Sequence, residues 1–403
     1  MEVQLGWWTK VETTDKDREE AARWLPRLWC LNPECEEFEL PDRGKVRFLR
    51  RYGANETQLL FGCRECEKTF SLRNGTPLYG LQMKDEKFFG IVSCSGEGNG
   101  IRNTARIVKV KNETVGRVVK RVGEHVSKLL KEDLRNMWPG EVQLDELWSY
   151  VGKKQRKRMK PEELRKEFGD CWIWVAFDPE TKVVLGYVLG KRTRENALKL
   201  LERVRDVLAD GSLPLFASDG FPVYEDVIVE VFGVMKRPRR NGRVGRFPKP
   251  RRVPGPGLTY VVVDKIRKKS RVIRVERRVA IGKKSDVEEA LAESEVSGKI
   301  NTAFIERQNG KLRADNSRLA RRTLGFSKDK KMLKHSLDLT IAYEMYCRPH
   351  GSLRQRDWGC TTRKWKPRTP MMAASITDHV WSVRELVLSR VPDRSTRTPF
   401  GGM

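Results

Sequence analysis

The sequence lacks long apolar runs: no stretch of about 20 consecutive apolar residues occurs in it. The first residues, Met-Glu-Val-Gln-Leu-Gly-Trp-Trp, also lack the basic end and apolar core of a signal peptide. We therefore expect no membrane span and a location in the reducing cytoplasm. In that compartment the 8 cysteines are expected to be metal ligands or core residues rather than disulfides.

Acidic residues are scarce relative to basic ones. The chain carries 54 Asp and Glu against 81 Lys and Arg, a net charge of +27 over 403 residues. Such an excess indicates a polyanionic partner, and nucleic acid is the expected one. A structural RNA-binding protein could share this charge, but eleven Trp residues and several strand-like segments favour a folded enzyme. A glycine-rich phosphate loop is absent, so the use of ATP is not expected.

Two close pairs of cysteines lie within residues 1–82, behind a helical pattern in residues 10–29. The first pair is spaced C-x4-C and the second C-x2-C, with strand-like segments between the pairs. Two such pairs on hairpins can present four thiolates tetrahedrally to Zn²⁺, so we expect a zinc ribbon with a structural zinc ion. The alternative is four unrelated thiols. The expected ligands are Cys30, Cys35, Cys63 and Cys66.

Residues 83–138 have the periodicity of three helices, with a short break at Val110 and Lys111 before the third. A short helix, a tight turn and a longer basic helix are typical of a helix-turn-helix DNA-binding domain. The alternative is a plain helical linker with solvated charges. The polar residues expected to face outward and to contact DNA are Lys109, Lys111, Thr114, Arg117, Lys120 and Arg121.

The segment 139–350 reads as three strands, a helix, a strand and further helices, which is the order of an α/β ribonuclease-H-like fold. Residues 235–300 do not continue this order of elements and are predicted to be an inserted, basic, β-rich segment. Its run Lys236–Arg252 holds nine Lys or Arg and no acid, and we expect a nucleic-acid arm there rather than a localisation signal. The arm residues singled out are Arg239, Arg240 and Arg243. Residues 351–403 are predicted to be a basic, loop-like C-terminal tail that closes with a small helical patch at Val380–Leu388.

Three acids stand in apolar surroundings that are costly for a carboxylate unless it is paired or binds a cation. Asp145 lies within an apolar strand, Asp219 ends another, and Glu306 lies on a helix that begins with apolar residues. Together they are predicted to hold two Mg²⁺ (or Mn²⁺) ions that act on phosphate. Glu146 competes with Asp145, but neighbours on a strand face opposite ways, and we choose Asp145. The alternative is that Asp145 caps a turn and Glu306 pairs with an Arg.

Three segments carry a resemblance to a known family: Leu-Asp-Glu-Leu-Trp-Ser-Tyr-Val-Gly (144–152), Ser-Asp-Gly-Phe-Pro-Val-Tyr (218–224) and Phe-Ile-Glu-Arg-Gln-Asn-Gly-Lys-Leu-Arg (304–313). They resemble insertion-sequence transposases of bacteria and archaea, most closely the "insertion sequence one" family. The resemblance implies a DDE triad of Asp145, Asp219 and Glu306. It implies metal-dependent cleavage of double-stranded DNA at terminal inverted repeats, followed by strand transfer into target DNA.

The leading hypothesis is therefore a DNA transposase near the nucleoid. A homodimer or a larger synaptic assembly is expected, because two DNA ends must be joined. Two other readings stay open. One is a domesticated, non-catalytic DNA-binding protein that kept the fold. The other is a nuclease of the ribonuclease-H class, which would share the metal site.

Overall fold

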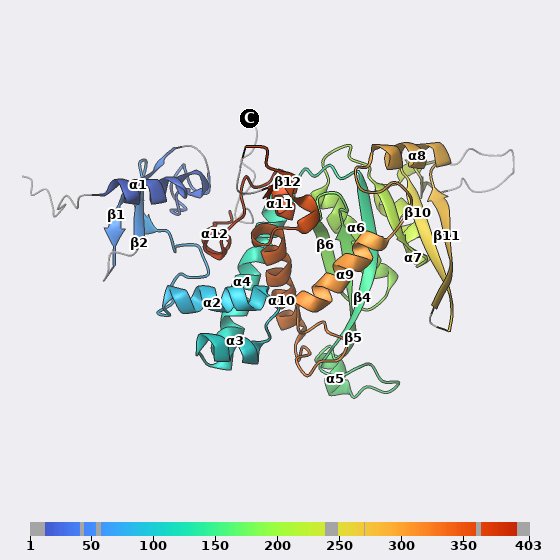
Figure 1. The fold of residues 1–403 in the computed structure, drawn as a ribbon, viewed down its shortest axis with the longest axis horizontal. Helices are drawn as coiled ribbons and strands as arrows, with labels where there is room; N and C mark the ends of the chain where they lie inside the picture. Colours follow the sequence, from blue (N-terminus) through green and yellow to red (C-terminus); the bar gives the residue numbers. More distant parts are fainter. Residues whose placement is uncertain are drawn as a thin grey trace, which may run out of the picture. The chain divides into compact units, whose positions relative to one another are not determined.

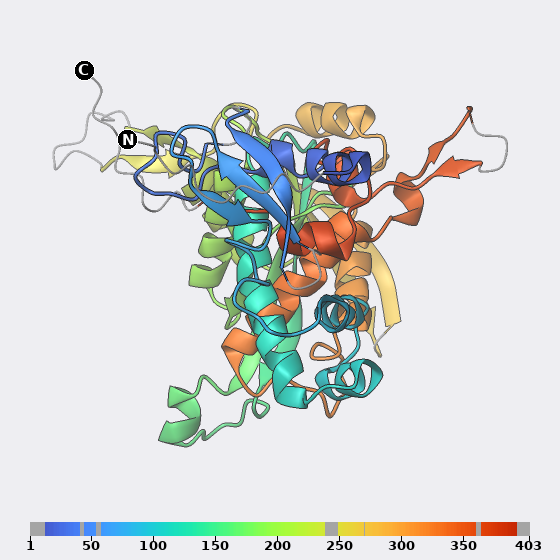
Figure 2. The same cartoon turned by 90° about the vertical axis from the view of Figure 1, so that its left-hand side faces the viewer.

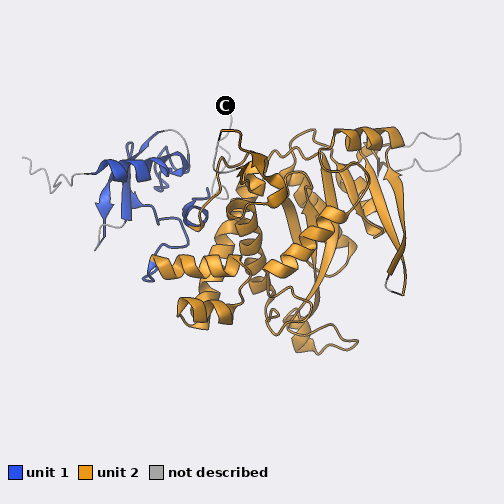
Figure 3. Cartoon of the chain, in the orientation of Figure 1, with its two compact units in different colours: residues 1–84, 384–403 blue, residues 85–383 orange. Residues whose placement is uncertain are grey.

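The computed structural model describes residues 13–40, 44–53, 58–237, 249–269, 271–359 and 364–392. The chain divides into two compact units, shown in different colours in Figure 3. Unit 1 comprises Met1–Lys84 together with Arg384–Met403, and unit 2 comprises Asp85–Val383. Within the described ranges no helix has both the length and the apolarity needed to cross a membrane.

Unit 1 is built on a three-stranded antiparallel sheet in the order β1-β2-β3. Its first helix is fixed by a capping box, in which the Thr14 hydroxyl accepts from the Asp17 amide and the Asp17 carboxylate accepts from the Thr14 amide. The buried rings of Phe61 and Phe70 form part of its core. The elements are α1 (Asp15–Ala22), η1 (Leu25–Arg27), β1 (Val46–Tyr52), β2 (Gln58–Cys63) and β3 (Thr69–Ser71).

Unit 2 begins with three helices, α2 (Asp85–Gly96), α3 (Ile101–Val108) and α4 (Asn112–Asp133). Lys109 ends α3 in the left-handed conformation, with φ 57° and ψ 56°, which turns the chain sharply into α4. The buried valines of α4 form one face, and α4 packs along α10 (Lys330–Ala342). The three helices thus belong to the same compact unit as the sheet, whereas the sequence predicted a separate domain over residues 83–138.

The centre of unit 2 is a six-stranded sheet in the order β11-β10-β7-β4-β5-β6. β5 pairs antiparallel with both of its neighbours, β4 and β6, and β7 runs parallel to β4. Side chains from Ile173 to Phe177 on β5 are all buried, whichever way they point, so both faces of the sheet are covered. The strands are β4 (Glu141–Val151), β5 (Gly169–Phe177), β6 (Val184–Gly190), β7 (Leu215–Asp219), β10 (Tyr260–Lys268) and β11 (Arg271–Ile281).

The prediction of an insertion over residues 235–300 is wrong for β10 and β11. β10 pairs in parallel with β7, from Tyr260 opposite Phe216 to Val263 opposite Asp219, and the run Val261–Val263 is buried. It is therefore a core strand, and β11 extends the sheet at its edge. The basic run before β10 concealed this in the sequence. Between β7 and β10 lie α7 (Val223–Phe232) and the short pair β8 (Val234–Lys236) and β9 (Arg251–Val253).

Helices cover the sheet, as Figure 1 shows for α9 (Ala303–Asp315), which crosses in front of β4. The helix α6 (Arg194–Val207) packs against β5 and β6 through its buried leucines. The remaining elements are α5 (Pro161–Arg165), α8 (Lys284–Glu293), the π-helical turn η2 (Tyr343–Cys347), η3 (Gly351–Leu353), β12 (Gln355–Arg356), β13 (Trp365–Lys366), α11 (Pro370–Ala373) and α12 (Val383–Leu388).

The C-terminal segment contains the helical patch that the sequence predicted, as α12, but the residues before it are not loop-like throughout. Thr369, Met371 and Met372 are buried, and α11 packs against η2 within unit 2. The run Leu386–Leu388 is also buried, and Arg390 lies 5% exposed within unit 1. These apolar runs are short and sit in a basic context, so composition alone concealed their packing.

Candidate active site and cysteine cluster

The centre of the candidate site lies where β4 and β7 stop pairing. The last paired residues are Leu144 and Ser218, so Asp145 and Asp219 are the next residues on two neighbouring parallel strands. In α/β sheets, ligands usually bind at the carboxyl ends of the strands, where two neighbouring strands separate. A Cβ at Gly220, directly after Asp219, would lie 1.9 Å from Oδ1 of Asp264, so a larger residue there would require the Asp264 carboxylate to move.

Asp145 is held by two hydrogen bonds from different elements. The Glu146 amide donates to Oδ1 at 2.8 Å, and the side-chain amide of Asn309, on α9, donates to Oδ2 at 2.9 Å. Burial, together with the nearby charge of Asp219, raises the pKa of Asp145 to about 6. Asn309 therefore orients the Asp145 carboxylate.

Asp219 has a carboxylate that is only partly satisfied. Its Oδ1 is buried and accepts no hydrogen bond from the described part of the chain. Burial raises the pKa of Asp219, and the nearby charge of Arg192 opposes that rise. A buried acceptor without a donor is costly, and a bound cation would satisfy it.

Glu146 joins this group, although strand alternation predicted that it faces away from Asp145. One carboxylate oxygen from each of Asp145, Glu146 and Asp219 lies within 4.8 Å of the other two. Glu146 also accepts from Arg192, whose Nη2 lies 3.0 Å and whose Nε lies 3.2 Å from Oε2. Burial raises the pKa of Glu146 to about 7. Strand alternation therefore does not separate the two carboxylates, although the pairing of β4 with β5 runs without a register shift from Gln143 to Val151.

Glu306, the third predicted acid, lines the same cleft but does not join the group of three carboxylates. Its Oε1 accepts from the Thr302 hydroxyl at 2.8 Å and is paired with the Lys265 ammonium. The alternative of a purely structural pair predicted an arginine partner, and the partner found is a lysine from β10. That lysine is available only because β10 belongs to the central sheet.

The cleft has a volume of about 740 Å³ and carries both acids and cations. Hard carboxylate oxygens are the ligands that Mg²⁺ and Mn²⁺ prefer, so the acids fit such ions. The cations around them would attract phosphate groups. Sequence reasoning missed these cations, because Lys and Arg are so abundant that no single one stood out. They are Arg192, Lys265, Arg267, Arg313 and Arg321.

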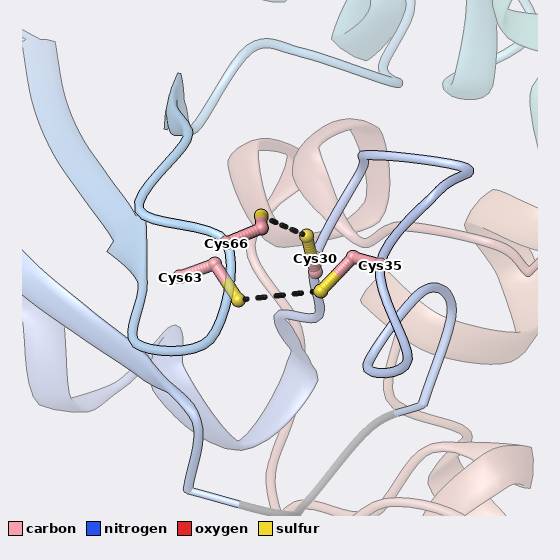
Figure 4. A group of neighbouring side chains, drawn as sticks. All are labelled: Cys30, Cys35, Cys63 and Cys66. Carbon is pink, nitrogen blue, oxygen red and sulfur yellow. Dashed lines mark hydrogen bonds between the residues drawn. The ribbon is translucent and has the colours of Figure 1, made fainter.

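The four cysteines predicted to bind zinc meet in unit 1. Their sulfur atoms all lie within 4.8 Å of one another, with 3.5 Å between Cys30 and Cys66 and 3.8 Å between Cys35 and Cys63 (Figure 4). Four sulfurs about 2.3 Å from a tetrahedral zinc ion lie about 3.8 Å apart, so this donor set fits Zn²⁺.

The pKa values of the clustered thiols shift in different directions. Burial raises the pKa of the Cys30 and Cys35 thiols. Burial also opposes ionisation of Cys66, but hydrogen bonds, first from the Lys68 amide and then from the neighbouring thiol of Cys30, lower its pKa to about 7. Cys66 thus ionises more readily than Cys30 and Cys35 and is the better placed of these three to begin metal binding.

Four of the six residues predicted to contact DNA from the helical region are exposed as expected. Lys109, Lys111, Arg117 and Lys120 are exposed, whereas Thr114 and Arg121 are half-buried. All of them lie at the turn between α3 and α4 or on the first turns of α4. The other three predicted contacts, Arg239, Arg240 and Arg243, lie outside the described residues.

The fold and the cleft define an α/β protein of ribonuclease-H-like topology, with carboxylates grouped where the central strands β4 and β7 stop pairing. Comparison with protein families adds that residues 141–238 match the family described as IS1 transposase. The match includes Asp145, Glu146 and Asp219 and ends before Glu306. The resemblance to this family that the sequence indicated is therefore confirmed.

Curated relatives agree. The chain is 32% identical over 84 residues to the insertion element IS1 protein InsB of Shigella flexneri, covering 21% of this chain and 51% of that protein. It is 29% identical over 106 residues to the insertion element IS1 4 protein InsB of Escherichia coli (strain K12), covering 26% and 53%. The chain thus spans about half the length of the curated relatives it matches.

Solved structures add little. The Mos1 strand transfer complex is 14% identical and covers 36% of this chain and 53% of that chain, with a TM-score of 0.15. At that TM-score the likeness supports no argument about this protein.

Proposed function

We propose that this chain is an insertion-sequence DNA transposase that cleaves and joins DNA by metal-dependent phosphoryl transfer. The catalytic residues are Asp145, Asp219 and Glu306. One observation carries this proposal: three acids that are far apart in the sequence line one cleft at the point where β4 and β7 separate. The similarity of residues 141–238 to IS1 transposases supports the choice of DNA as substrate.

Divalent metal would be held by Asp145, Asp219 and Glu306, and we propose two Mg²⁺ or Mn²⁺ ions. The unsatisfied Oδ1 of Asp219 and the closeness of the Asp145 and Asp219 carboxylates, within 4.8 Å of each other, favour this assignment, and Glu306 lines the same cleft. When bound, the ions would activate water or a 3′-hydroxyl and stabilise the leaving oxygen of an in-line displacement.

The protein's own side chains position these groups. Asn309 and the Glu146 amide hold the Asp145 carboxylate in one orientation through its two oxygens. Lys265 neutralises Glu306 and lies in the cleft with Arg192, where both can bind the phosphates that flank the cleaved bond. Positive charge in the cleft thereby draws in the DNA backbone.

DNA recognition is assigned to other parts of the chain. The turn between α3 and α4, with Lys109 and Lys111, would act as a helix-turn-helix on double-stranded terminal repeats. The cysteine cluster, with a structural Zn²⁺, would support a second DNA-binding module in unit 1. Because two ends must be joined, the active form would be a homodimer or a larger assembly.

The test uses DNA that spans the ends of the parent element, with Mg²⁺ or Mn²⁺ added. The wild-type chain should cleave at the ends and join the freed 3′ end to target DNA. Asp219→Asn should abolish cleavage and leave binding to the ends nearly intact. Asp226→Asn is a matched control, because Asp226 is exposed on α7 and does not line the cleft.

Each alternative function has its own result in this assay. Binding to the ends without cleavage by the wild-type chain would indicate a DNA-binding protein without catalysis. Cleavage that is never followed by joining would indicate a nuclease of the ribonuclease-H class. Cleavage retained by Asp219→Asn would remove Asp219 from the catalytic site.

A further inference from the structure

A short hairpin leaves unit 2 between η2 and α11. Its base is closed by the His350 amide, which donates to the Arg368 carbonyl at 2.8 Å. β12 and β13 pair antiparallel, with Gln355 opposite Lys366 and Arg356 opposite Trp365. In Figure 2 this red hairpin extends away from the helices that precede and follow it.

Two tryptophans on the hairpin are exposed rather than packed. Trp358 is 80% exposed, and Trp365 is 37% exposed. A guanidinium lies over each ring: that of Arg356 is 4.0 Å from the centroid of the Trp358 ring, and that of Arg354 is 4.4 Å from the centroid of the Trp365 ring. Exposing an indole on this scale is unfavourable in water, and a surface with exposed aromatic rings is typical of a binding site.

The charge of the hairpin restricts what can bind to it. Its described residues 351–359 and 364–368 contain five cations and a single acid, Asp357. A second copy of this chain, with a net charge of +27, would be repelled by that charge. A polyanion would be attracted, and nucleic acid adds flat bases that stack on indole and guanidinium groups. The cations are Arg354, Arg356, Lys364, Lys366 and Arg368.

We propose that this hairpin binds DNA whose bases are unpaired, with Trp358 stacking on a base and the cations around it contacting phosphates. Stacking requires an open base face, which duplex DNA does not offer away from its ends. Single-stranded segments arise when DNA ends are cut or frayed, so the inference deepens the proposed function. It does not depend on catalysis, because binding is measurable without divalent metal.

The decisive variant is Trp358→Ala in the full-length chain. Its affinity for a single-stranded oligonucleotide and for a duplex with a short single-stranded overhang should fall about tenfold. Its affinity for the blunt duplex should change less than about twofold. Binding is measured by fluorescence anisotropy. A 2-aminopurine in the overhang should be quenched by stacking when the wild-type chain binds, and this quenching should be lost with Trp358→Ala.

The chain offers a matched control. Trp138 is 69% exposed in the same unit and lies outside the hairpin, so Trp138→Ala should leave all three affinities unchanged. Trp358→Phe keeps an aromatic face and should retain most of the single-strand affinity. A second variant, Lys364→Gln with Lys366→Gln, should weaken binding to every DNA form and reduce its salt dependence.

Several results would overturn the proposal. Equal losses for single-stranded and blunt duplex DNA in Trp358→Ala would exclude base stacking. A loss of self-association in sedimentation without DNA would make the hairpin a contact between copies. Unchanged affinities would exclude the hairpin from DNA binding altogether. If the wild-type chain fails to cleave DNA while these binding differences hold, the catalytic proposal fails and this inference stands.

Discussion

Glu146 and Asp145 carry adjacent carboxylates that are both harder to ionise than usual. Burial raises the pKa of Glu146 to about 7 and that of Asp145 to about 6. In an unfolded chain these groups titrate near about 4.3 and 3.9. Between the two ranges the folded protein binds more protons than the unfolded chain, so folding stability falls as pH rises through this window.

Replacing Glu146 by Gln removes one of these titrations. Glu146→Gln should therefore gain stability relative to wild type as pH rises from about 5 to about 7. The measurement is urea unfolding of both proteins, without divalent metal, at several pH values. Glu163→Gln is the control: the Lys153 ion pair lowers the pKa of Glu163, so its difference from wild type should stay constant in this window. A constant difference for Glu146→Gln as well would contradict the raised pKa.

The sequence could predict that Asp145 and Asp219 lie in the cleft, but not which side chains contact the acids there. Asp145 and Asp219 stood out because each interrupts or ends an apolar strand, and such burial needs compensation. Arg192 and Lys265 could not be selected in the same way, because their roles depend on strand order. That order is a long-range property, and it brings β10 beside β7 only in the folded chain.

At the scale of elements, the contact between α4 and α10 depends on one glycine. A Cβ on Gly123 would lie 2.5 Å from the His335 carbonyl oxygen of α10, so the two helices approach too closely for a side chain. Gly123→Ala should destabilise the protein by about 1–3 kcal/mol through overpacking. Gly116→Ala, on the same helix with nothing within 4 Å, should be neutral or stabilising by up to about 1 kcal/mol. Thermal unfolding compares the two, and equal effects would show that the contact is not tight.

The C-terminal segment of unit 1 supplies a buried guanidinium close to the cysteine cluster. Arg390 donates to the carbonyls of Trp29 and Ser71 at 3.0 Å and of Asn74 at 3.2 Å. Burial lowers its pKa to about 9, and Cys30, in its thiolate form, opposes that shift. A buried cation needs compensating negative charge, and four zinc-bound thiolates would supply it.

Removing this guanidinium should therefore weaken the zinc site. Arg390→Met leaves carbonyl acceptors unsatisfied and removes the compensating charge, so zinc loss to a chelator should be about tenfold faster. Arg384→Met is the control, because its pair with Glu20 is a partly exposed ion pair at 3.4 Å and should contribute little. Identical release from the two variants would separate Arg390 from the metal site, and a metal-free wild-type protein would refute zinc itself.

At the scale of the whole molecule, the dominant property is the net charge of +27. Counterion release makes binding driven by phosphate contacts steeply dependent on salt. Raising salt from about 50 to about 200 mM should therefore weaken DNA binding about 10³-fold or more, if six or more phosphates are neutralised. The slope of log affinity against log salt reports how many cations take part.

The contribution of a single cation to this salt dependence can then be measured by substitution. Lys111 is exposed at the start of α4, so Lys111→Gln should reduce the slope by about 1 and weaken binding similarly for all DNA sequences. A loss confined to the terminal repeats would instead assign Lys111 to base recognition. Salt-independent affinity of the wild-type chain would mean that its positive charge does not act on phosphates. The proposed DNA partner would then lose its main physical support, because only electrostatic attraction accounts for so large an excess of basic residues.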